Sequence, residues 1–214
     1  MQEESPVREE LIANTPIEAV LFDLGGVVFD INFGQAFSVW AVHSGTEMDD
    51  LAQLFSFDDA YMRHERGEID AHAYFLSLAR TMEIDITEAE WVEGWNAIYG
   101  DEFGGMAELL REIGESVPIY AFSNSNPTHQ EVWEQKYHDT LDLFRGIFVS
   151  SDMGVRKPEA KSYQAVAARI GVVPEMVLFF DDTHENVTGA ETVGMSAIHV
   201  GSIEDIRSAA NRIL

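Results

Sequence analysis

The stretch spanning residues 19–30 (AVLFDLGGVVFD) constrains the fold more than any other part of the sequence. Its first four residues are all apolar, which is typical of a strand buried on both faces of a parallel sheet. The run ends at a single acid, Asp23, and Gly25 and Gly26 then allow the backbone to turn sharply. This pattern predicts that Asp23 lies at the carboxyl end of a central strand, where open α/β sheets bind their ligands. The alternative is an aspartate that only caps a turn.

The composition indicates a globular protein that repels other anions. At 214 residues and 46% hydrophobic content, the chain is long enough for one α/β core and a smaller domain. Its 38 acidic and 13 basic residues give a formal charge of -25, which disfavours binding to nucleic acid or anionic lipid. A phosphorylated substrate would need concentrated positive charge, so the few lysines (Lys136, Lys157 and Lys161) are of interest. The lack of cysteine excludes disulfides, thiol nucleophiles and Cys-metal sites.

The ends of the chain and its hydropathy predict a soluble, cytoplasmic protein. Residues 1–16 are polar and acidic, so we expect a disordered tail and no secretory signal. No run of 18 apolar residues occurs, so no membrane span is expected. We expect a small-molecule substrate, no nucleic-acid or membrane partner, and a monomer or homodimer.

The remainder of the chain divides into a helical segment and an alternating one. Residues 33–98 contain helical spacings in two segments, which carry Ala73, Leu76, Leu78 and Met82, and Trp91, Trp95, Ile98 and Tyr99. After residue 105, strands at 117–122, 146–150, 176–180 and 195–200 alternate with helices at 106–114, 159–170, 185–193 and from Ser202 onward. We therefore predict a doubly wound, mostly parallel, Rossmann-like α/β core (17–32 and 101–214) with an inserted helical cap (33–100).

A charged, glycine-containing turn, His64-Glu65-Arg66-Gly67-Glu68, interrupts the helical segment. It is either a solvated connection between helices or a specificity loop that lies over the substrate, with Arg66 as its candidate substrate-binding residue.

Polar residues follow the other core strands at the points where those strands end. Ser123 and Asn124 follow the second strand, Asp181 and Asp182 follow the fourth, and Lys157 precedes the helix between the third and fourth. Singly, Ser123 reads as a helix cap, Lys157 as a surface cation and the two aspartates as a turn. Because parallel strands present their carboxyl ends at one edge, we expect all of them to converge on Asp23.

The chemistry that fits this set is phosphoryl transfer. A carboxylate that attacks phosphorus is one anion attacking another, so charge must be neutralised on both sides. Asp23, Asp181 and Asp182 form an oxygen cage suited to Mg²⁺, which the carbonyl of Gly25 can complete. Ser123, Lys157 and the amides of the Gly25-Gly26 turn would bind the phosphoryl oxygens.

The motifs FDLGGVV, FSNSN, RKPEAKSY and FFDDTHEN, in this order, resemble those of the haloacid dehalogenase (HAD)-like hydrolases, and the helical insertion resembles the small cap of that family. Longer segments, such as DLGGVVFDINF, HERGEI and SNSNPTHQEVW, are similar to the branch that contains bacterial α-D-glucose-1-phosphate phosphatase. The resemblance implies a Mg²⁺-dependent phosphatase of a small metabolite such as glucose 1-phosphate. It makes Asp23 the nucleophile, Ser123 and Asn124 phosphate ligands, and Lys157 the stabilising cation. Asp182 would bind Mg²⁺ directly, and Asp181 directly or through water.

One position departs from the family pattern, because Gly25 stands where its phosphatases usually carry a second aspartate that acts as general acid and base. Loss of such a group slows a reaction by roughly 10²–10⁴-fold, unless the leaving group needs no proton. The glucose-1-phosphate branch shares this glycine, and an anomeric phosphate has a good leaving group. His64, Glu65 or Asp30 are candidates to supply the proton.

Three classes of function follow. The first is the phosphatase. The second is a dehalogenase-type hydrolase, whose aspartate attacks carbon and has no use for a cation cage. The third is a weakly catalytic binding or regulatory protein that kept the fold.

Overall fold

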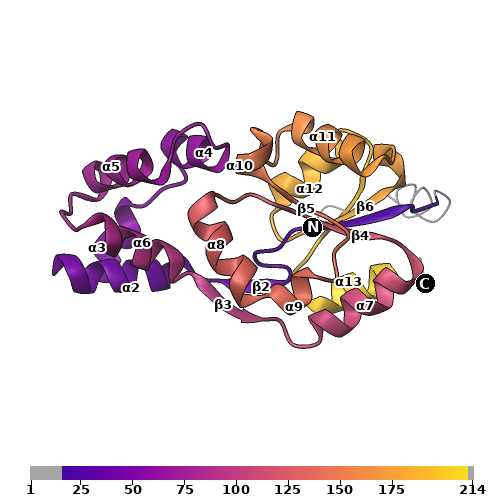
Figure 1. The fold of residues 1–214 in the computed structure, drawn as a ribbon, viewed down its shortest axis with the longest axis horizontal. Coiled ribbons are helices and arrows are strands. Elements are labelled where there is room, and N and C mark those ends of the chain that lie inside the picture. The colour runs from indigo at the N-terminus through magenta and orange to yellow at the C-terminus, as the bar shows by residue number, and fades with distance from the viewer. Residues whose placement is uncertain (1–15, 212–214) are drawn as a thin grey trace, which may run out of the picture.

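The computed structural model describes residues 16–211, so all but Pro16 of the predicted tail lies outside the described residues. The molecule has two parts, which lie side by side along its longest axis (Figure 1). One is a sheet with helices on both faces, and the other is a group of helices formed by the segment between residues 33 and 96.

The sheet is five-stranded and parallel, in the order β5-β4-β1-β6-β7. Its strands are β1 (Ala19–Phe22), β4 (Ile119–Ser123), β5 (Ile147–Val149), β6 (Val177–Asp181) and β7 (Ser196–His199). Each lies within about two residues of a predicted strand, and β1 occupies the centre as expected. The doubly wound, Rossmann-like fold class is therefore confirmed.

Successive side chains of β1 point to opposite faces of the sheet and pack in two separate hydrophobic cores. Val20 and Phe22 point to one face, where Phe22 stacks on Phe180 of β6 at 5.1 Å between ring centroids. Ala19 and Leu21 point to the other. Complete burial of a valine, leucine or phenylalanine side chain stabilises a fold by about 1.5–3 kcal/mol, so the strand that ends in Asp23 is anchored from both sides. The first face is covered by α7 (Met106–Ser116), α8 (Pro127–Lys136), α9 (His138–Leu141) and α13 (Ile203–Ala210), and the second by α11 (Ala160–Ile170) and α12 (His184–Glu191). Short helices α10 (Ser150–Met153) and η1 (Pro174–Met176) complete the connections.

The second part has its own hydrophobic core. Its helices are α2 (Phe33–Ser44), α3 (Met48–Leu54), α4 (Asp59–Glu65), α5 (Ala71–Met82) and α6 (Glu88–Asn96). Trp40, Trp91 and Trp95 pack together at its centre. Leu76, which the sequence placed on the apolar stripe of α5, is exposed, because Tyr74 and Phe75 face the core instead. Side chains cap α2, α4, α5 and α6, which fixes where each of these helices begins.

A second, two-stranded sheet was not predicted. Strands β2 (Phe29–Ile31) and β3 (Tyr99–Glu102) pair antiparallel, with Ile31 opposite Tyr99, where the chain enters and leaves the helical part. The helical assignment of Tyr99 was wrong, since α6 ends at Asn96. The domain boundaries at 32/33 and 100/101 stay predictions.

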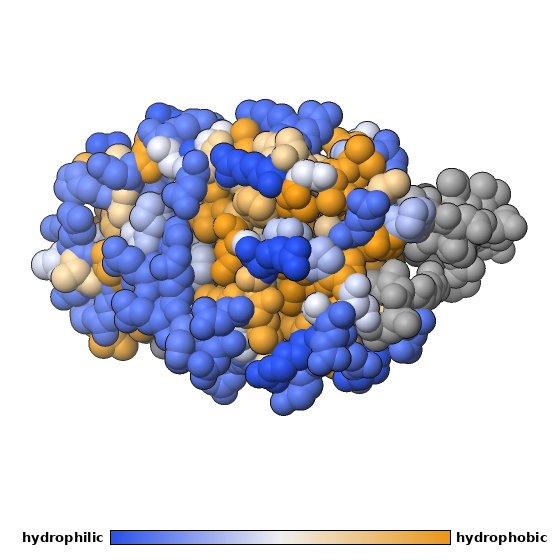
Figure 2. Space-filling view, turned by 45° about the vertical axis from the view of Figure 1, so that its right-hand side comes forward, coloured by the Kyte–Doolittle hydropathy of each residue, from blue (hydrophilic) through white to orange (hydrophobic). Residues whose placement is uncertain are grey.

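The surface of the helical part is predominantly hydrophilic on its left side in Figure 2, in keeping with the acidic composition. None of the helices within the described residues is both long and apolar enough to cross a membrane.

Candidate active site

Asp23 lies at the carboxyl end of β1 with its side chain 13% exposed. The backbone amide of Asp23 donates to the carbonyl of Phe180 on β6, which fixes the position of the residue at the sheet edge. One of its carboxylate oxygens, Oδ1, accepts a hydrogen bond from the amide of Leu24 at 2.7 Å. The predicted presentation of a single acid beyond the central strand is present in the structure.

Lys157 is completely buried beside Asp23, and the surface-cation interpretation is therefore wrong. Its Nζ lies 2.9 Å from Asp23 Oδ1 and 2.7 Å from Asp181 Oδ2. Burial alone would lower the pKa of Lys157, but the two carboxylates outweigh burial and raise that pKa. The ammonium group is therefore held charged between two acids, in a chain that has few cations.

The predicted carboxylate cage also forms. One oxygen each of Asp23, Asp181 and Asp182 lie within 4.8 Å of one another. Burial raises the pKa of Asp23 to about 8, an effect that Lys157 opposes and the neighbouring carboxylates increase. Burial and Asp181 also raise the pKa of Asp182. A bound divalent cation would offset this repulsion and favour the ionised forms, so the donor set and its excess negative charge both fit a hard cation.

Asp181 and Asp182 differ in their surroundings. Asp181 is fully buried, and both of its oxygens accept hydrogen bonds. The donors are Lys157 Nζ, the amide of Thr183 and the side-chain amide of Asn186, at 2.7–3.1 Å. Asp182 is exposed, and it lies so close to the loop after β1 that a Cβ on Gly26 would overlap its carboxylate. Gly26 also has a φ of 78°, so glycine is needed there for both the turn and the close approach.

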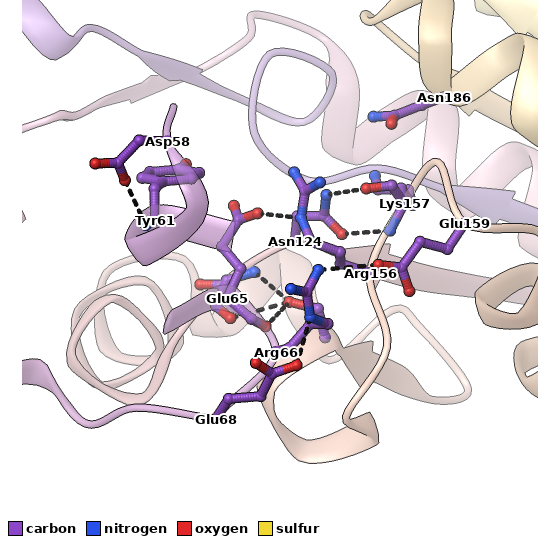
Figure 3. Close-up of polar contacts among 12 residues, drawn as sticks. Asp58, Tyr61, Glu65, Arg66, Glu68, Asn124, Arg156, Lys157, Glu159 and Asn186 are labelled. Carbon is purple, nitrogen blue, oxygen red and sulfur yellow. Dashed lines mark hydrogen bonds and ion pairs between the residues drawn. The ribbon is translucent and has the colours of Figure 1, made fainter. Parts of the chain in front are cut away.

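Ser123 and Asn124 lie on the opposite side of Asp23, at the end of β4. Ser123 does not cap a helix, because the N-cap of α8 is Asn126. The side chain of Asn124 forms two hydrogen bonds with the backbone of Lys157: its amide donates to the carbonyl at 3.0 Å, and its oxygen accepts from the N–H at 2.9 Å (Figure 3). Asn124 therefore positions the lysine through its side chain.

The turn after α4 docks on the α/β part and is not a solvated connection. Arg156 Nε donates to the buried carboxylate of Glu65 at 2.7 Å, and Arg66 pairs with Glu159 at 3.0 Å and with Glu68 at 2.7 Å (Figure 3). The hydroxyl of Ser150 donates to the carbonyl of Glu65 at 2.6 Å.

A pocket of about 80 Å³ opens between Asp23 and the helical part. It is lined by Asp23, Gly25, Phe29, Ile31, Phe33, Tyr61, Ile98, Tyr99, Ser123, Asn124, His129 and Trp133. Arg66 is not among these residues, and neither are the proton-donor candidates His64, Glu65 and Asp30. His64 is buried against Tyr74, Glu65 is held by Arg156, and Asp30 is exposed.

Sequence reasoning did not single out His129 or Asn186. His129 is buried, its Nε2 donates to the carbonyl of Trp95 at 2.9 Å, and burial lowers its pKa to about 3, so its ring is neutral. Asn186 lies in the first turn of α12 and binds Asp181. The signal for Asn186 was its place in the motif FFDDTHEN, five residues after Asp181 at a strand-to-helix junction.

The fold and these side chains are those of a Rossmann-like hydrolytic enzyme with an inserted helical segment. The chain belongs to the haloacid dehalogenase-like hydrolases, whose family profile matches residues 17–194. It is 30% identical over 190 residues to the sesquiterpene phosphatase astK of Aspergillus oryzae, a match that covers 87% of this chain and 91% of that protein. It is 20% identical over 203 residues to a D-ribitol-5-phosphate phosphatase of Bacteroides thetaiotaomicron, covering 92% and 98% of the two chains.

Among solved structures, the fold is similar to a HAD family enzyme of Bacteroides thetaiotaomicron in complex with magnesium and inorganic phosphate. The TM-score is 0.72 at 23% identity, and the match covers 86% of this chain and 93% of that one. These findings establish the family, while the glucose-1-phosphate branch stays a prediction.

Proposed function

We propose that the protein is a Mg²⁺-dependent phosphatase that hydrolyses a small phosphate monoester through an aspartyl-phosphate on Asp23. The observation that carries this proposal is the pairing of Asp23 with buried Lys157 on one side and two further carboxylates on the other. Two relatives named as phosphatases, and a similar fold that binds magnesium and phosphate, support it.

The hydrogen bonds of the three aspartates suggest how they would share the cation. Asp23 and Asp182 have free oxygens for direct coordination, whereas both oxygens of Asp181 already accept protein donors. Asp181 would therefore act through water and hold Lys157 in place, and the carbonyl of Gly25 stays a candidate ligand. The cation supplies positive charge that draws together the carboxylate and the phosphate ester.

The reaction has two steps. A carboxylate oxygen of Asp23 attacks phosphorus, the bond from phosphorus to the alcohol oxygen breaks, and that oxygen leaves with the electron pair and takes a proton from water. Water then attacks phosphorus and loses a proton to the solvent, and the bond from phosphorus to the Asp23 oxygen breaks, which frees Asp23 and inorganic phosphate. Lys157 Nζ, the hydroxyl of Ser123, and the backbone amides of Asn124 and Gly25 stabilise the transferring group. The amide of Gly26, which the sequence also predicted as a donor, is not available, because it donates to the carbonyl of Phe29 at 2.8 Å. The resemblance predicts glucose 1-phosphate as the substrate, and this stays a prediction.

The test is release of p-nitrophenol from p-nitrophenyl phosphate, with Mg²⁺ and after chelation. We expect chelation and, separately, Asp23→Asn to abolish turnover, because the amide keeps the shape of the side chain but is a poor nucleophile. Asp139→Asn, which changes an exposed acid, is the matched control and should keep wild-type activity. Undiminished activity in chelator would refute the metal role, and chloride release from 2-chloropropanoate would then identify the dehalogenase alternative.

A further inference from the structure

The residues that line the active-site pocket are polar next to Asp23 and mostly aromatic or aliphatic elsewhere. The inner end is polar and is formed by Asp23, Ser123 and Asn124, which the proposed reaction uses for the phosphoryl group. The rest is lined by Phe29, Ile31, Phe33 and Ile98, whose side chains are hydrocarbon, and by the aromatic residues Tyr61, Tyr99, His129 and Trp133. The organic part of a bound ester would therefore lie against aromatic and aliphatic side chains.

The polar atoms of these outer walls lie close to other polar groups of the protein. The hydroxyl of Tyr61 lies beside the carboxylate of Glu65, and that of Tyr99 lies beside Ser125. Both ring nitrogens of His129 are engaged, one by the carbonyl of Trp95 and the other by the side chain of Asn126. A sugar would bring several hydroxyls into this space without partners, and each buried, unpaired hydroxyl weakens binding by roughly tenfold or more.

The aromatic wall continues outward to the surface of the helical part. Phe57, which is 60% exposed, packs on Phe33 at 5.5 Å and on Tyr61 at 4.8 Å between ring centroids. Phe55 contacts Phe33 and Phe57 from the side. The pocket itself holds a phosphoryl group and only a few carbon atoms, so a longer hydrocarbon would extend along Phe33 to Phe57.

We infer that the substrate is the phosphate monoester of an apolar alcohol, with a hydrocarbon chain or ring in place of a sugar, and that Phe57 is a specificity-determining residue for longer chains. This inference rests on the proposed phosphatase function.

The test compares esters that share a primary alkoxide leaving group, so that only the organic part varies. With Mg²⁺ present, and below micelle-forming concentrations, kcat/KM is measured for n-alkyl phosphates from ethyl to octyl and for glucose 6-phosphate. We expect kcat/KM to rise roughly two- to fourfold per methylene until the apolar wall is covered, which follows from the transfer free energy of a buried methylene. Glucose 6-phosphate should be at least about tenfold poorer than hexyl phosphate, on the desolvation argument above.

The outcomes separate this inference from the proposal on which it rests. Hydrolysis with no dependence on chain length, or a preference for glucose 6-phosphate over hexyl phosphate, overturns the inference and leaves the phosphatase in place. Hydrolysis of none of the esters overturns both.

Two variants test the role of Phe57. Phe57→Ser should lower kcat/KM for octyl phosphate roughly fivefold or more, through KM, and leave ethyl phosphate unchanged, because the short chain does not reach that ring. Val42→Ser removes another exposed apolar side chain, 80% exposed on α2, and should affect neither ester. Equal losses on ethyl and octyl phosphate would show that Phe57 is only structural.

Discussion

Ile31 occupies the space that any side chain at position 25 would need. A Cβ on Gly25 would overlap Cδ1 of Ile31 and lie 3.1 Å from its Cγ1. The backbone of Gly25 is not in the left-handed region, so the obstacle to a side chain there is Ile31 and not strain of the turn. Overpacking of this kind costs about 1–3 kcal/mol, and replacing glycine recovers about 0.4–1 kcal/mol by restricting the unfolded chain. From the middle of these two ranges, we expect Gly25→Ala to lower the free energy of unfolding by about 1–2 kcal/mol.

A second substitution tests that reason directly. Ile31→Val removes Cδ1, the overlapping atom, at a cost near the lower end of about 0.5–1.5 kcal/mol because Ile31 is only half-buried. When Ile31→Val is already present, Gly25→Ala should be neutral or slightly stabilising. The two changes should then couple by about 1–2 kcal/mol, in favour of the double variant.

The assay is urea denaturation, followed by tryptophan fluorescence, of the wild type, both single variants and the double variant. Thermal midpoints should follow, by about 2–4 °C for each kcal/mol in a chain of this size. Gly104→Ala is the matched control, because a Cβ there meets nothing within 4 Å, and it should be neutral or stabilising. A Gly25→Ala variant as stable as the wild type, or costs that simply add, would refute the steric argument.

The remaining predictions concern catalysis and pH. Gly25→Asp combined with Ile31→Val places a proton donor beside Asp23, and such a donor accelerates hydrolysis by roughly 10²–10⁴-fold when the leaving group needs a proton. We therefore expect kcat/KM for alkyl phosphates to rise towards that for aryl phosphates. An unchanged ratio of the two would mean that protonation of the leaving group does not limit the wild type. Lys157→Met should weaken tungstate binding at least about tenfold, as expected when a buried charged hydrogen bond is lost. Lys161→Met, which changes an exposed lysine, is the control. Equal affinities of the two variants would show that Lys157 does not contact the anion. His129 resists protonation in the folded protein, with its pKa lowered to about 3, whereas the unfolded chain binds that proton below about pH 6.5. Stability should therefore be lost as the pH falls from about 6.5 towards 3, by at most about 1.4 kcal/mol per pH unit from this group. His129→Asn should remove that part of the slope in urea denaturation, and exposed His138→Asn should retain it; identical slopes in the two variants would contradict the assignment.

The core strands were predictable because their signal is local. Strands β1, β4 and β6 are short, mostly apolar runs that are buried on both faces, and a polar residue stands where each strand leaves the sheet. This is why Asp23, Ser123 and the pair Asp181-Asp182 were placed correctly relative to one another before any geometry was known.

Features that depend on distant partners were not predictable. Tyr99 continues the helical spacing of Trp91 and Trp95, yet it forms a strand because Ile31 pairs with it from the other end of the insertion. The turn after α4 reads as solvated because its partners, Ser150, Arg156 and Glu159, lie far along the chain. The complete burial of Lys157 also depends on partners distant in the sequence, Asp23 and Asp181, since a lysine in a charged segment ordinarily lies at the surface.

The pairing of β2 with β3 makes the inserted helical segment replaceable. Because Ile31 and Tyr99 face each other across that pair, the whole segment between them departs from and returns to one spot on the α/β part. The length of this segment is therefore not set by any span that it must bridge, and its hydrophobic core is largely its own. A short turn from residue 31 to residue 99 would close the pair as a simple hairpin without stretching the sheet. The substrate-facing half of the molecule is in this sense exchangeable: another insert, joined at the same two strands, would present a new wall to an unaltered Asp23.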